Sequence, residues 1–158
     1  MGEYVMTTVI IGGPLAGRAG GVALIAAAEA YLVDAGSLVH EALAEVRGVT
    51  FEGEQDYGLT PSLDAFCREH GLSYHRAWIA RLGLFEAGVK HRSPGLEGPV
   101  EEAADEAGEP MITLVALRDG HDAGETLPDL LTRLERAVAA AVPPLSLAAP
   151  GAPEQAPA

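Results

Sequence analysis

Two carboxylates flank a histidine in the run Arg118-Asp119-Gly120-His121-Asp122. A histidine beside Asp119 and Asp122 can serve as a general base or as half of a divalent-metal site. The chain has no second histidine cluster and no nucleophile motif to complete such a site. The candidate catalytic residues are therefore His121, Asp119 and Asp122, which form an incomplete catalytic set. We predict no metal site. The alternative is an Asp-Gly turn on the surface.

A glycine-rich turn is predicted after the first strand, at residues 12–19 (GGPLAGRA). The backbone N–H groups of such a turn, where a helix begins, can hold an anion. The spacing resembles the P-loop of nucleotide-binding proteins, which implies a phosphate site, but an arginine and an alanine replace its lysine and hydroxyl residue. The alternative is a close-packed connection between strand and helix. The candidate anion-binding residues are Gly12, Gly13, Gly17 and Arg18.

Positive charge is concentrated in residues 66–92, which hold five of the ten Lys and Arg residues and only two acidic residues. Within this segment, residues 63–82 fit a helix-turn-helix, with Gly71 in the turn and Ser73 capping the second helix. That pattern predicts a small DNA-binding regulator. We favour a different interpretation, a patch of basic and aromatic residues that contacts a protein partner. The patch consists of Tyr74, His75, Arg76, Trp78 and Arg81.

Composition limits the remaining possibilities. The 158 residues carry a formal net charge of −13, which repels nucleic-acid phosphates and disfavours DNA binding. The single cysteine, Cys67, excludes an intramolecular disulfide and a cysteine-based zinc site within the chain. No basic leader and no apolar run of about 20 residues is present, so we predict a cytoplasmic protein that does not bind a membrane. No cofactor is predicted. The excess of arginine over lysine indicates high-GC bacterial or phage coding.

The elements that position these residues follow from the hydrophobic pattern. The β-branched run Tyr4–Ile11 predicts a buried strand, and the apolar run Met111–Leu117 predicts a central one. Leucines at helical spacing predict a helix that begins after Thr126. Residues 74–82 fit a helix and a strand, and we favour the helix. Further helices are predicted within residues 20–33, 38–46 and 61–70.

Strands followed by helices predict an α/β or α+β fold, a small single domain with a short sheet packed by helices. The domain is predicted to span residues 1–142, with an acidic, linker-like loop at 93–110. Residues 143–158 are rich in Ala and Pro and predict a disordered tail.

Because no catalytic set is complete, we expect a non-enzymatic interaction or assembly protein. It is expected to be homo-oligomeric and to act through the basic and aromatic patch in residues 66–92. The first alternative is the DNA-binding regulator with its helix-turn-helix at 63–82, and a strand within residues 74–89 would eliminate it. The second is an enzyme or binding protein that holds an anionic ligand at residues 12–18.

Overall fold

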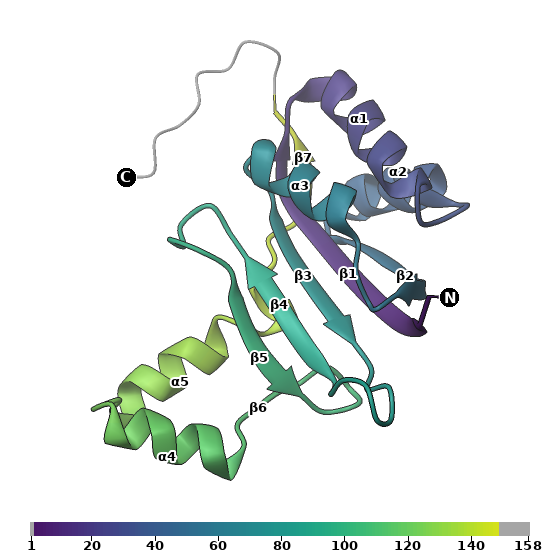
Figure 1. Ribbon diagram of the computed structural model, residues 1–158. Coiled ribbons are helices and arrows are strands. Elements are labelled where there is room, and N and C mark those ends of the chain that lie inside the picture. The colour runs from purple at the N-terminus through teal and green to yellow at the C-terminus, as the bar shows by residue number, and fades with distance from the viewer. Residues whose placement is uncertain (1, 149–158) are drawn as a thin grey trace.

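The longest strand, β1 (Tyr4–Leu15), runs through the sheet around which the chain folds. The computed structural model describes residues 2–148 (Figure 1). β1 pairs antiparallel with β2 (Val49–Asp56) on one side and with β3 (Ser73–Trp78) on the other. Beyond β3, the sheet continues antiparallel through β4 (Gly88–Arg92), β5 (Val100–Ala104) and the short β6 (Pro110–Met111).

Three helices pack against one face of this sheet (Figure 1). They are α1 (Gly17–Glu29), α2 (Ala35–Glu45) and α3 (Pro61–Glu69). Side chains alternate between the two faces of a strand, so every second residue of β1 points toward the helices. The aliphatic core between sheet and helices includes Val9, Ile11, Leu24, Val39, Phe51 and Leu63.

After β6, the chain leaves the sheet and forms a helical hairpin that projects away from α1–α3 (Figure 1). Its helices are α4 (Leu114–Asp122) and α5 (Leu127–Glu135). The chain returns through the 3-10 turn η1 (Ala139–Ala141) to β7 (Leu145–Leu147). β7 pairs in parallel with the end of β1, and Leu145 is buried in the main core.

The fold class is confirmed as a small α+β domain with a sheet packed by helices. The strand predicted at Tyr4–Ile11 is also confirmed, and it continues to Leu15. Gly12 and Gly13, which were predicted to form a turn, lie within this strand. The strand continues because the returning chain pairs with it: the Gly13 N–H donates to the Pro144 carbonyl over 3.1 Å.

The helix-turn-helix prediction at 63–82 is wrong. Its first helix corresponds to α3, but Ser73–Trp78 form strand β3 where the second helix was expected. Tyr and Trp favour strands, and β3 pairs with β1 and β4 at once. Tertiary pairing thus decides a segment whose local pattern fits both structures.

The strand prediction at Met111–Leu117 is wrong as well. Only Met111 belongs to β6, and α4 begins at Leu114 because the Thr113 hydroxyl accepts the Ala116 N–H over 3.1 Å. The predicted acidic loop at 93–110 contains β5, and the predicted tail contains β7. The rest of that tail, residues 149–158, lies outside the described residues.

Candidate functional site

The predicted basic and aromatic patch does not form one surface. Along β3, Tyr74 and Arg76 pair with the β1 residues that point toward the helices, whereas His75 lies on the opposite face. Arg81 lies in the hairpin between β3 and β4, where it forms an ion pair with Glu3 over 2.9 Å. The Trp78 indole N–H donates to the Glu86 carbonyl over 3.0 Å. Strand alternation, which a helix would not impose, therefore divides the predicted patch.

His75 and His91 form a buried pair on the sheet face opposite α1–α3. They are direct cross-strand partners in β3 and β4, and their ring centroids are 5.6 Å apart. Burial, and then the neighbouring His91, lower the pKa of His75 to about 4. Burial also lowers the pKa of His91. Both Nδ1 atoms lack a hydrogen-bond partner within residues 2–148, and the lowered pKa values keep both imidazoles neutral at neutral pH.

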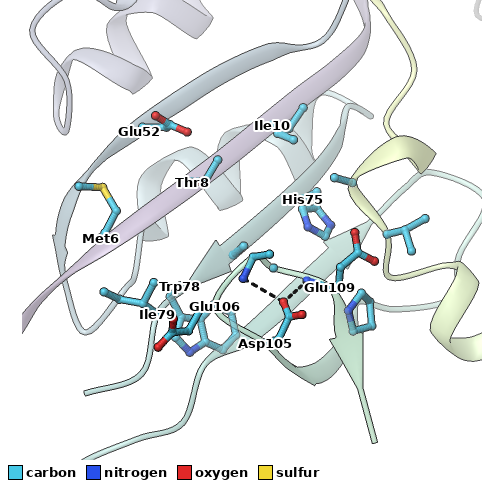
Figure 2. Close-up of a pocket in the computed structure, with 16 residues that line it drawn as sticks. Met6, Thr8, Ile10, Glu52, His75, Trp78, Ile79, Asp105, Glu106 and Glu109 are labelled. Atoms are coloured by element: carbon cyan, nitrogen blue, oxygen red, sulfur yellow. Dashed lines mark hydrogen bonds between the residues drawn. The ribbon is translucent and has the colours of Figure 1, made fainter. Parts of the chain in front are cut away.

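A hollow of about 300 Å³ opens over His75 on this face (Figure 2). β1, β2 and β3 form its floor, and the loop before β6 contributes acidic side chains to its rim. The Asp105 carboxylate already accepts the N–H groups of Ala107 and Glu109, each over 2.9 Å, and so holds a turn (Figure 2). The hollow therefore joins one neutral imidazole, that of His75, to several carboxylates, and its described residues supply no complete catalytic set.

The hairpin of α4 and α5, hereafter the α4–α5 arm, is exposed along most of its length. α4 contains no buried residue, and α5 contains only Leu130. Five large apolar side chains of the arm are between 43 and 69% exposed. They are Leu114, Val115, Leu117, Leu127 and Leu131.

Polar contacts give the α4–α5 arm a defined shape despite this exposure. Thr126 and Asp129 form a capping box at the start of α5, with the Asp129 N–H donating to the Thr126 hydroxyl. The Thr126 hydroxyl and N–H both donate to the Asp129 carboxylate, and these two hydrogen bonds lower the pKa of Asp129. Arg133 of α5 forms ion pairs with Glu102 of β5, over 2.5 Å, and with Glu125. These ion pairs therefore fix the arm to the edge of the sheet, while its apolar side chains remain exposed to solvent.

Sequence reasoning missed this surface. The leucines of α5 have helical spacing, which predicts a helix packed on a core, but only Leu130 meets one. The apolar residues before Asp119 were assigned to a buried strand. The helix after Thr126 is confirmed as α5, and the missed signal is Thr113, which caps a short helix where a strand was predicted.

The candidate catalytic residues Asp119, His121 and Asp122 lie on α4, in the exposed arm. Their predicted position after a central strand is therefore wrong, although their chemistry stays a prediction. Within residues 2–148, no group of three His, Cys, Asp or Glu side chains could hold a metal ion.

The four candidate anion-binding residues are also dispersed. Gly12 and Gly13 belong to β1, Gly17 begins α1, and Arg18 is exposed on that helix. Gly12 faces the Pro143 carbonyl so closely that a Cβ atom there would overlap it. This close approach, and the hydrogen bond from the Gly13 N–H, explain both strand glycines without a ligand. Anion binding at residues 12–18 stays a prediction.

Comparison with protein-family models, with curated proteins and with solved structures found no match to this chain. Among the described residues, no helix has the length and apolar character needed to cross a membrane.

Proposed function

We propose that this protein is a non-enzymatic assembly protein whose α4–α5 arm packs against the arm of a second copy. One observation carries the proposal: α4 buries none of its residues, although three large apolar side chains lie along it. An isolated helix of nine residues is marginal in water, and most helices gain their stability by packing an apolar face. A partner that covers the arm would supply this packing.

The arm offers enough apolar surface to support association. Its five large side chains are a little over half exposed on average. Fully burying one Val or Leu side chain stabilises by about 1.5–3 kcal/mol, so covering the exposed parts contributes about 6 kcal/mol per chain. A pair of arms would contribute about 12 kcal/mol against an association cost of about 4–15 kcal/mol. This balance supports a reversible dimer.

A second copy is a suitable partner because α4 and α5 both expose large apolar side chains, so the arm of one copy can cover the arm of the other. Two antiparallel hairpins can pack face to face as a four-helix arrangement, in which Leu114 and Leu131 of each copy meet apolar residues of the other. A twofold axis through such a contact closes the assembly at two chains, which is the commonest arrangement for soluble oligomers.

The test is the oligomeric state of the full chain, measured by light scattering after size-exclusion chromatography over a hundredfold range of concentration. We expect a dimer that the double variant Leu114→Glu/Leu131→Glu converts to a monomer. Both side chains are exposed within one chain, so the variant should keep its fold. Leu82→Glu is the matched control because Leu82 is fully exposed in the β3–β4 hairpin, outside the arm. A monomeric parent protein, or dissociation by Leu82→Glu as well, would contradict the proposal.

A further inference from the structure

A second hollow lies between α3, β3 and β4, on the face of the sheet that α1–α3 cover. Its volume is about 410 Å³, within the range of about 300–1,000 Å³ typical of small-ligand sites. We call this hollow the basic pocket. Its charged and aromatic lining residues are Asp64, Arg68, Tyr74, Arg76, Lys90 and Arg92. The lining thus holds four basic residues and one acidic residue, in a protein of net charge −13.

The strand register places like charges side by side in the basic pocket. Arg76 of β3 is the direct cross-strand partner of Lys90 in β4, and Tyr74 is the partner of Arg92. Like charges directly opposite each other destabilise a sheet. Glu101 of β5 is the partner of Lys90 on its other side, yet the two form no ion pair. The sheet therefore maintains a concentration of positive charge that its own acids do not neutralise.

Arg76 is held at the base of this pocket. It is only 3% exposed, and one terminal nitrogen of its guanidinium donates to the Gly58 carbonyl. Its Nε lies 3.5 Å from an Asp64 carboxylate oxygen and has no hydrogen-bond partner within residues 2–148. The guanidinium carbon lies 5.1 Å from the centre of the Trp78 ring. A buried donor without a hydrogen-bond partner is rare in folded proteins, and here the Asp64 carboxylate partly balances the charge of Arg76 through the ion pair.

The remaining cations of the pocket are available to a ligand. Arg68, Lys90 and Arg92 form no ion pair with any part of the chain that the structure describes. Burial raises the pKa of the Tyr74 phenol, which keeps its O–H as a donor at neutral pH. Arginine, lysine and tyrosine side chains donate hydrogen bonds to the oxygens of phosphate and carboxylate groups.

We infer that the basic pocket binds the oxyanion group of a small molecule, a phosphate or a carboxylate. Lys90 and Arg92 contact the oxyanion directly, and the Tyr74 hydroxyl donates a third hydrogen bond. Arg76 supplies fixed positive charge beneath them. A small molecule fits better than a protein segment because the donors line one hollow of about 410 Å³ between a helix and two strands. The inference is independent of the assembly proposal, since no residue of the pocket belongs to the α4–α5 arm.

The test is isothermal titration calorimetry of the full chain with inorganic pyrophosphate and with citrate, at constant ionic strength set with chloride. Hydrogen bonds to charged groups are strong enough that Lys90→Gln and Arg92→Gln should each weaken binding about tenfold or more. Arg136→Gln is the matched control because it removes the same charge from an exposed position just after α5, outside both the basic pocket and residues 12–18. It should leave binding unchanged. A preference for pyrophosphate identifies a phosphate ligand, and a preference for citrate identifies a carboxylate ligand.

Three results would overturn the inference. In the first, neither probe binds the parent protein. In the second, Arg136→Gln weakens binding as much as Lys90→Gln, which would indicate general electrostatic attraction. In the third result, a synthetic peptide with the sequence of the acidic segment 97–109 binds the protein more tightly than both probes and competes with them. Urea unfolding separates lost binding from lost folding: removing Lys90 relieves its repulsion of Arg76, so Lys90→Gln should unfold at an equal or higher urea concentration than the parent.

Discussion

The buried histidine pair makes the stability of this protein sensitive to mild acid. His75 is 2% exposed, and its pKa of about 4 lies well below the ordinary value of 6.5 that it regains on unfolding. Between pH 4 and pH 6.5, His75 is therefore protonated in the unfolded chain but neutral in the folded chain. The contribution of neutral His75 to the free energy of unfolding is therefore fully present above pH 6.5 and is lost as the pH falls toward 4.

The size of the effect follows from the two pKa values. Between pH 7.5 and pH 5.0, the titration of His75 alone should lower the free energy of unfolding by about 2 kcal/mol. His91 acts in the same direction because burial lowers its pKa too. The acidic side chains around the sheet-face hollow do not offset the loss, since none lies within ion-pair distance of His75.

The assay is urea unfolding at fixed ionic strength at pH 7.5, 6.5, 5.5 and 5.0. The parent protein should lose about 2 kcal/mol or more over this range, and His75→Gln should lose about 2 kcal/mol less than the parent. His40→Gln, which removes an exposed histidine from α2, should follow the parent. A parent protein equally stable at pH 7.5 and 5.0, or a His75→Gln variant with the same pH dependence as the parent, would refute the reasoning.

Three further predictions concern single residues. Gly12→Ala places a methyl group against the Pro143 carbonyl and should lower the free energy of unfolding by about 3 kcal/mol in urea unfolding; an unchanged midpoint would contradict this packing. Thr126→Ala removes the Thr126–Asp129 capping box and should cost about 1 kcal/mol, measured the same way, whereas a neutral effect would mean that α5 frays regardless. Cys67 is buried and its thiol pKa is raised, so it should react with a thiol reagent only in denaturant; rapid labelling of the folded protein would disagree.

Local signals predict part of this fold well. The run Tyr4–Ile11 alternates between helix-facing and opposite positions in a strand, and its β-branched residues suit that structure. The Ala-rich segment that follows forms α1, as its composition suggests. These elements are correct because local propensity and tertiary packing favour the same structure.

The errors arise where long-range pairing decides. Ser73–Trp78 is a strand because two strands pair with it, and one of them, β1, lies about 60 residues earlier in the sequence. Gly12 lies within a strand because residues near 143 approach it from the far end of the described chain. The basic pocket combines α3, β3 and β4, so its charges converge only once the register is known. Charge clustering in residues 66–92 indicates the region but not which side chains share a face.

The parallel pairing of β1 with β7 also has a consequence for how the protein folds. Gly13 and Leu145 are direct partners although they are about 130 residues apart, so their contact closes nearly the whole described chain into one loop. Closing a long loop costs conformational entropy, and contacts of such large sequence separation slow folding. During synthesis, the end of β1 must wait without its partner until β7 has emerged from the ribosome. The Gly13–Leu15 segment is then an unpaired strand edge, and it is where we expect a nascent chain to be most prone to aggregation.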